Sequence, residues 1–146
     1  MKPFVFGLEK VLNLKKHYED EAKIELGRAV GVLAELEQRL MDLAAERVRA
    51  SAAQFQPENS IAEIQQYTFY IIRLDALKEE LLKETAIAEL KVEEARQAFL
   101  DASRERKVLD KIKEKRQKEY RKKSLGEETK TTDDISSATR IALQQA

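Results

Sequence analysis

The feature that most constrains this chain is a heptad pattern of apolar residues that is interrupted once, at Pro57. A proline removes a backbone donor and clashes with the preceding turn, so a helix should end just before it. Asn59 or Ser60 can cap a second helix, and Glu63 completes a capping box with Ser60. The pattern therefore predicts two helices joined by a loop.

Apolar residues repeat at alternating steps of three and four on both sides of this break, which is the spacing of a coiled-coil seam. Nine of twelve such positions are apolar in the first run, at Leu12, Lys15, Glu19, Ala22, Leu26, Ala29, Leu33, Leu36, Leu40, Leu43, Arg47 and Ala50. Eleven of fourteen are apolar in the second, at Tyr67, Tyr70, Leu74, Leu77, Leu81, Glu84, Ala88, Lys91, Ala95, Ala98, Ala102, Glu105, Leu109 and Ile112.

The two runs align in antiparallel register when the chain folds back at Pro57, because Leu40 then meets Leu74 and Leu12 meets Ala102. The expected fold is all-α: an antiparallel two-helix coiled-coil hairpin with a longer second helix and a short, flexible C-terminal segment. We expect one domain, 1–146, with helix one at about 3–53, a loop at 54–60, helix two at about 61–123 and a tail at 124–146. Gly126 should end the second helix, and a short last helix is expected from Ile135 to about Leu143.

The composition supports helices and offers little for catalysis. Charged residues make up 37% of the 146 residues, and the chain has no Cys, no Trp, 4 Gly and 2 Pro. Its single histidine, His17, has no second His or Cys with which to share a metal. No Gly-rich phosphate loop or nucleophile motif is present, and no apolar stretch reaches the roughly 18 residues of a membrane span. We expect a soluble protein that is not an enzyme and needs no cofactor or metal.

The balanced net charge hides an uneven distribution. Residues 104–123 hold 11 Lys+Arg and 4 Asp+Glu, whereas residues 1–103 hold 14 against 19. The predicted alignment leaves everything past about Leu109 without a partner on the first helix, so the basic stretch should be an overhang. Such a stretch can bind an acidic protein surface, nucleic acid or anionic lipid. Only Tyr120 could stack on a base, so a specific nucleic-acid reader is not expected.

Apolar residues also occur off the predicted seam. Phe69 and Ile72 face away from helix one, and a two-helix hairpin cannot bury them. Leu82, Leu90 and Leu100 are also predicted to point outward. These residues indicate a docking surface or self-association.

Three segments carry a further signal. They are Phe4-x-Phe6-x-Leu8-Glu9-x-Val11-Leu12-x-Leu14 followed by Glu19; Leu109-x-x-Ile112-Lys113-x-Lys115 with Tyr120; and Glu127-Glu128-x-Lys130 with Asp133-Asp134-Ile135. In this order they resemble the FliJ family of the bacterial flagellar type III export apparatus. The resemblance implies a non-enzymatic central stalk and chaperone escort that links the hexameric export ATPase to the cytoplasmic domain of the export-gate membrane protein. It implies a cytoplasmic location at the flagellar base, peripheral to the inner membrane, with membrane contact only through partners.

The resemblance also implies two sets of contact residues. The ATPase-ring contact would comprise Phe4, Phe6, Leu8, Leu12, Leu109, Ile112, Lys113 and Arg116. The export-gate contact would fall on Tyr70, Leu74, Leu77 and Leu81, to which the outward Phe69 and Ile72 are added from the sequence pattern. Two alternatives stay open: the stalk of a virulence-type secretion system, and a coiled-coil scaffold that homodimerises through Phe69 and Ile72. A binder of nucleic acid or membrane surfaces through residues 104–123 is a further rival.

Overall fold

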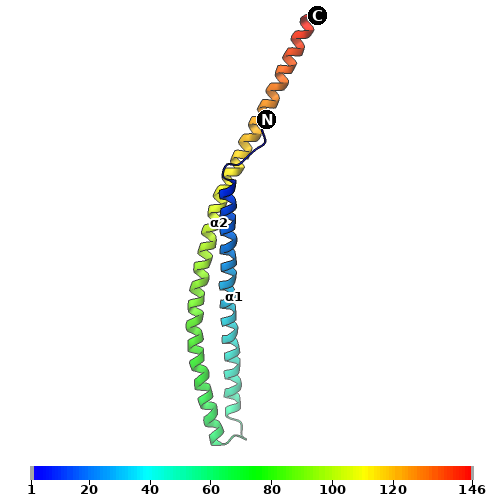
Figure 1. Ribbon diagram of the computed structural model, residues 1–146. Coiled ribbons are helices and arrows are strands. Elements are labelled where there is room, and N and C mark those ends of the chain that lie inside the picture. Colours follow the sequence, from blue (N-terminus) through cyan, green and yellow to red (C-terminus); the bar gives the residue numbers. More distant parts are fainter. Residues whose placement is uncertain (1, 146) are drawn as a thin grey trace. The chain divides into compact units, whose positions relative to one another are not determined.

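A computed structural model describes residues 2–145, and the first and last residues of the predicted domain lie outside this range. The chain forms two antiparallel helices, α1 (Glu9–Gln54) and α2 (Ile61–Gln145), and the described residues contain no strand (Figure 1). The predicted all-α hairpin with a longer second helix is confirmed. Helix α1 begins at Glu9 rather than near residue 3, and α2 continues to Gln145 rather than ending near residue 123.

Contacts within the chain divide it into two compact units. Unit 1 comprises Met1–Glu19 and Ala102–Ala146, and unit 2 comprises Asp20–Asp101. Unit 2 therefore contains the loop with the helical segments on either side of it. Unit 1 contains the chain's beginning, the first turns of α1 and the remainder of α2.

The loop around Pro57 is closed by side chains at both of its ends. The Ser60 amide donates to the Glu63 carboxylate at 3.1 Å, and the Glu63 amide donates to the Ser60 hydroxyl at 3.2 Å. This reciprocal pair confirms the predicted capping box at the start of α2. The Asn59 side-chain amide instead donates to the carbonyls of Ala53 and Gln54, at 2.6 and 3.1 Å, and so caps the end of α1.

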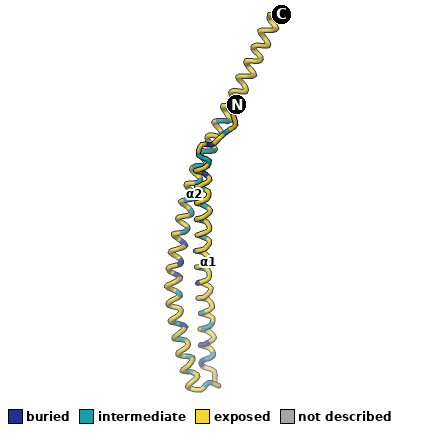
Figure 2. The backbone as a smooth tube through the Cα atoms, in the orientation of Figure 1, coloured by how far each residue is buried: buried dark blue, intermediate teal, exposed yellow. Residues whose placement is uncertain are grey.

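The seam of α1 lies where the heptad pattern predicts it (Figure 2). Leu12, Leu36 and Ala50 are buried, and nearly all other predicted positions are half-buried. Arg47 is the exception, because its side chain is exposed and reaches across to Asp75. The spacing in the first run was therefore enough to orient the helix.

The seam of α2 differs from the prediction at every second position. The shared positions Leu74, Ala88 and Ala95 do face α1, but Tyr70, Leu77, Glu84, Lys91, Ala98 and Glu105 are exposed. The less exposed residues are Ile71, Thr85, Val92, Phe99 and Arg106, each one residue beyond a predicted position. Lys78, which follows Leu77, is exposed, and Ile112 and Lys113 are both half-buried. Steps taken from Tyr67 in the order four, three share every second position with the predicted order three, four. The structure follows the order four, three because Val92 and Phe99 bury more apolar area than Lys91 and Ala98 would.

The register of the hairpin is also shifted from the predicted one, by about one heptad. The alignment that pairs Leu40 with Leu74 would set Arg47 opposite Tyr67, whereas Arg47 bonds to Asp75 at 2.6 Å. In unit 1, Lys15 bonds to Glu105 at 2.9 Å, although the predicted partner was Ala98. A slide of one heptad places seam residues on seam residues again, so the apolar pattern alone cannot distinguish the two registers.

Residues 124–145 continue α2, although the sequence predicted a break at Gly126. Thr131 and Thr132 lie just before the expected last helix, where threonine hydroxyls could have capped its start. Their hydroxyls instead donate to the carbonyls of Glu127 and Glu128, four residues earlier, as in a helix interior. A glycine costs a helix only about 1 kcal/mol relative to alanine, which does not require a break. Residues 125–145 are exposed throughout.

Candidate interaction surfaces

The residues predicted to contact the ATPase ring are all in unit 1. Phe6 and Leu12 are buried, at 5% and 0% exposure, whereas Arg116 is exposed. The other five predicted residues, Phe4, Leu8, Leu109, Ile112 and Lys113, are half-buried. Several of these side chains therefore form the local core of unit 1, and Arg116 is the member fully open to a partner.

The N-terminal segment (residues 2–6) precedes α1 and contacts α2 beyond Leu109. The rings of Phe4 and Tyr120 lie 5.6 Å apart, and the Tyr120 hydroxyl donates to the Lys2 carbonyl. The Phe6 ring lies 5.5 Å from the Arg116 guanidinium carbon and 6.0 Å from the Lys113 ammonium. The expectation that α2 is unpartnered past Leu109 is therefore wrong for the turns that carry Lys113, Arg116 and Tyr120.

This contact was missed because the heptad pattern stops before it. Phe4 and Phe6 alternate with the exposed Val5, which is the period of an extended chain rather than of a helix. That alternation is the signal in the sequence that could have indicated an extended segment packed on one face.

Ion pairs link α1 and α2 throughout unit 1. Lys113 lies 2.9 and 3.1 Å from the two carboxylate oxygens of Glu9. Arg106 donates to Glu19 at 2.6 Å and also to Asp110, and these two hydrogen-bonded carboxylates raise the pKa of its guanidinium above the ordinary value. Arg106 and Glu19 are both mostly covered, so this pair is the least solvent-screened of the interhelical ion pairs described.

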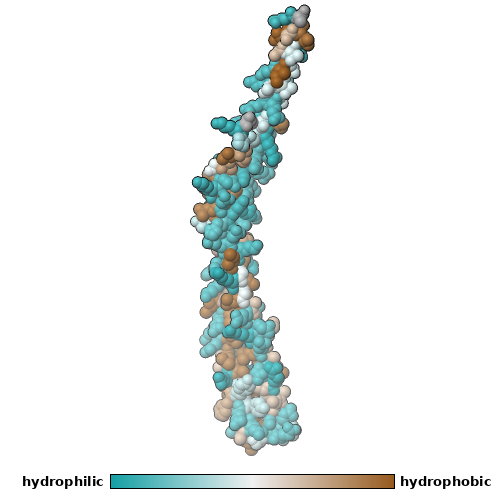
Figure 3. All heavy atoms as spheres, turned by 45° about the vertical axis from the view of Figure 1, so that its right-hand side comes forward, coloured by the Kyte–Doolittle hydropathy of each residue, from teal (hydrophilic) through white to brown (hydrophobic). Residues whose placement is uncertain are grey.

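Most basic side chains of residues 104–123 remain exposed. The exposed cations beyond the ion pairs of Arg106 and Lys113 are Arg104, Lys107, Lys111, Lys115, Arg116, Lys118, Arg121, Lys122 and Lys123. On the face that Figure 3 shows, hydrophilic side chains predominate, with hydrophobic ones scattered between them. Unit 1 therefore presents a cationic surface that suits an acidic partner.

The predicted export-gate residues lie in unit 2 on two different faces of α2. Tyr70, Leu74, Leu77 and Leu81 follow one strip, because each lies three or four residues, about one helical turn, from the next. Leu74 is buried and Leu81 is half-buried, whereas Tyr70 and Leu77 are exposed at the edge of the seam. Phe69 and Ile72 are 71% and 59% exposed, which confirms that they point outward.

A hydrogen bond to α1 holds the Tyr70 side chain in place. Its hydroxyl donates to the Glu46 carboxylate at 2.9 Å, which raises the pKa of Tyr70. Hydrogen bonds from Arg49 and then from Tyr70 lower the pKa of Glu46. The guanidinium of Arg47 likewise lowers the pKa of Asp75.

A groove of about 350 Å³ lies between the helices near the same strip. Leu40, Leu43, Val48, Leu74 and Leu82 supply its apolar lining. Leu74 therefore contributes to a concave surface even though it is buried in the seam. The charged residues Arg47, Asp75 and Lys78 also line the groove, and Arg47 and Asp75 form an ion pair with each other.

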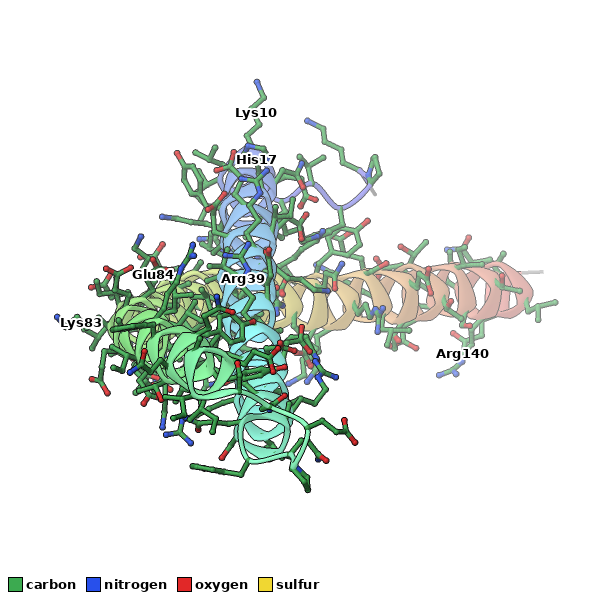
Figure 4. All side chains as sticks on the ribbon, turned by 90° about the horizontal axis from the view of Figure 1, so that it is seen from below. Lys10, His17, Arg39, Lys83, Glu84 and Arg140 are labelled. Atoms are coloured by element: carbon green, nitrogen blue, oxygen red, sulfur yellow. The ribbon has the colours of Figure 1, made fainter. Side chains whose placement is uncertain are left out.

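The described residues contain no group of three or more His, Cys, Asp or Glu side chains that could hold a metal ion. His17 is exposed, with its ring 6.2 Å from that of Tyr18. Glu84, predicted on the seam, lies beside Lys83 on a side of α2 away from α1 (Figure 4). Neither helix, over the range that the structure covers, is long and apolar enough to cross a membrane.

The fold and these surfaces define a two-helix coiled-coil protein whose candidate sites are surfaces for other macromolecules. A family model described as flagellar FliJ protein matches residues 4–144, and the chain belongs to the FliJ family. The fold is similar to that of a solved structure from Chlamydia trachomatis, described as a candidate YscO homologue. That similarity has a TM-score of 0.62, 19% sequence identity and 99% coverage of both chains. Comparison with curated protein sequences gives no match.

Proposed function

We propose that this chain is the central stalk and chaperone-escort protein of the flagellar type III export ATPase complex, and that it links the ATPase ring to the export gate. The observation that carries the proposal is the match to the FliJ family over residues 4–144. The antiparallel hairpin supports it, since a stalk needs two long helices and no catalytic pocket of its own. The chain then acts in the cytoplasm at the flagellar base and reaches the inner membrane through its partners.

The proposed ring contact is on unit 1. Its eight residues are those that the family resemblance implies, from Phe4 to Arg116, and the structure supports two roles among them. Buried side chains such as Leu12 hold the surface in shape, while Arg116 and its exposed basic neighbours attract an acidic ring lumen. Charges at such a rim mainly raise the association rate, and their effect weakens with salt.

The proposed gate contact is on unit 2, at Phe69, Tyr70, Ile72, Leu74, Leu77 and Leu81. Exposure of Tyr70 and Leu77 supports it, because seam residues would be available only after the hairpin opened. Phe69 and Ile72 face another direction, so a partner that touches all six residues must wrap around α2. Export chaperones are the third class of proposed partner.

The proposed effect on ATP hydrolysis requires no chemistry in this chain. A stalk changes turnover by binding some conformations of the ring more tightly than others. We therefore propose a non-enzymatic role, with no cofactor and no bound metal.

The experiment is an ATPase assay with the cognate export ATPase and increasing concentrations of this chain. The native chain should stimulate hydrolysis, and a charge reversal at Lys115 and Arg116 should raise the half-maximal concentration, most strongly at low salt. Lys130→Glu is the matched control, since Lys130 is exposed on the same helix outside the basic stretch. Absence of stimulation by the native chain would contradict the stalk proposal.

A homodimerising scaffold is the second candidate, because Phe69 and Ile72 are both exposed on one side of α2. Measurement of solution mass separates the two candidates. A stable dimer at micromolar concentration that dissociates in a Phe69→Ser, Ile72→Ser variant would favour the scaffold, whereas a monomer supports the stalk.

A further inference from the structure

The N-terminal segment covers part of the surface that the proposed function assigns to the ATPase ring. Phe6 lies against the cationic groups of Lys113 and Arg116 within 6.0 Å, and Phe4 lies against Tyr120. Phe6 is 5% exposed in this arrangement. A partner that binds the same turns of α2 must therefore accept the segment or displace it.

The segment is attached to α2 more weakly than α1 is. Residues 2–6 form no regular secondary structure, and their contacts with α2 come from two aromatic rings and the hydrogen bond from Tyr120 to the Lys2 carbonyl. Helix α1 begins just after it and is held separately, by the ion pair between Glu9 and Lys113 and by the fully buried Leu12. Release of residues 2–6 therefore leaves these α1 contacts in place. Segments with few backbone hydrogen bonds are the first to open locally.

We propose that the N-terminal segment is a detachable cover that occupies the ring-binding turns of α2 in the free protein and leaves them when the ring binds. This inference rests on the proposed function, and it adds regulation of the same site. Release uncovers the rings of Phe6 and Tyr120 beside Arg116, which is already exposed, so apolar groups are added next to a cation. The partner surface that fits is acidic with exposed apolar side chains.

A cover of this kind lowers the apparent affinity for the ring. The apparent dissociation constant is the intrinsic one divided by the fraction of open molecules, so a cover closed about nine-tenths of the time weakens binding about tenfold. Holding the segment permanently closed should weaken it further, and holding it open should remove the tenfold factor.

Docking of the segment can be observed without the ring. The chain has no tryptophan, so Phe4→Trp introduces a single fluorophore at the contact with Tyr120. Its emission should be blue-shifted in the free protein and should move to the wavelength of an exposed tryptophan when Tyr120→Ala is added. Val5→Trp is the matched control, because Val5 is 80% exposed and should give the red-shifted emission in both backgrounds. Identical emission from the Phe4→Trp variant with and without the Tyr120→Ala change would overturn the inference.

Regulation can be tested with a reversible lock, since the chain has no cysteine. Lys2→Cys and Tyr120→Cys, neither of which is among the eight ring-contact residues, are combined and joined by a short bis-methanethiosulfonate linker, which a reductant cleaves. The linked protein should need at least about ten times more chain for half-maximal ATPase stimulation than the same protein after reduction. The single-cysteine proteins, treated identically, control for modification of either site.

The outcomes separate this inference from the proposed function. Equal stimulation by the linked and the reduced protein overturns the cover and leaves the stalk intact. A lack of stimulation by the native chain overturns the stalk, and the regulatory inference with it.

Discussion

Leu12 offers the sharpest test of the packing in unit 1, because its side chain is fully buried. Leu12→Ala removes three carbon groups, each worth about 0.8 kcal/mol when buried, so the transfer cost is about 2.4 kcal/mol. Fully packed cores add a cavity cost that brings such changes to about 3–5 kcal/mol. The neighbouring positions Val11 and Asn13 are exposed and leave the site room to collapse, so we expect about 2.5 kcal/mol.

Leu14→Ala is the matched control, since it makes the same chemical change two residues away on the same helix. Leu14 is 47% exposed, so about half of its area is already in water and the cost should be about 1.2 kcal/mol. The difference in helix propensity between leucine and alanine is common to both variants and cancels.

The assay is urea unfolding followed by far-UV circular dichroism, together with hydrogen exchange at the amides of residues 9–19. Leu12→Ala should lower the free energy of unfolding and speed exchange in these turns, and Leu14→Ala should have about half that effect. Equal losses in the two variants, or a loss below about 1 kcal/mol in Leu12→Ala, would refute the assignment of Leu12 to the seam.

Three further predictions concern unit 2. Because Arg47 lowers the pKa of Asp75, their pair stabilises the fold above the ordinary carboxyl value of 3.8, and this contribution is lost as the pH falls through the lowered pKa. Asp75→Asn should therefore reduce stability at neutral pH and weaken the acid-induced decline in a circular-dichroism titration; an unchanged decline would count against the pair. Gly31→Ala should raise the melting temperature by an amount equivalent to about 0.5–1 kcal/mol, since an added Cβ meets no atom within 4 Å, and a lower melting temperature would contradict this. Ser60→Ala should cost about 1 kcal/mol in thermal unfolding through loss of the cap, and a neutral result would show that the cap carries no net stability.

The hairpin could be predicted from the sequence because its determinants are local. Pro57 and the Ser60–Glu63 pair act within a few residues, and the α1 seam follows from spacing within one helix. The heptad pattern of α2 allowed either of two adjacent residues to be the seam residue at every second position. The choice of Val92 over Lys91 and of Phe99 over Ala98 depends on packing against the facing helix.

The remaining features depend on contacts that no local pattern contains. The register is periodic in the heptad, so the bond between Arg47 and Asp75 distinguishes alignments that the apolar residues cannot. The continuation of α2 through Gly126 reflects the tolerance of a long helix for one weak residue. The packing of Phe4 on Tyr120 joins residues that are far apart in the chain, and for that reason the candidate ring surface was predicted without the segment that covers it.

The closure of the loop has a consequence for the order in which the chain folds. The bond from Asn59 to Ala53 joins residues six apart in sequence, whereas the bond from Tyr120 to Lys2 spans 118 positions. The entropy lost in closing a loop grows with the length of the loop, so contacts near Pro57 can form first and bring successive pairs together in turn. The hairpin should therefore zip from Pro57 outward, with residues 2–6 docking last. In the cell, the part of α2 that residues 2–6 cover should therefore be exposed until this last step of folding.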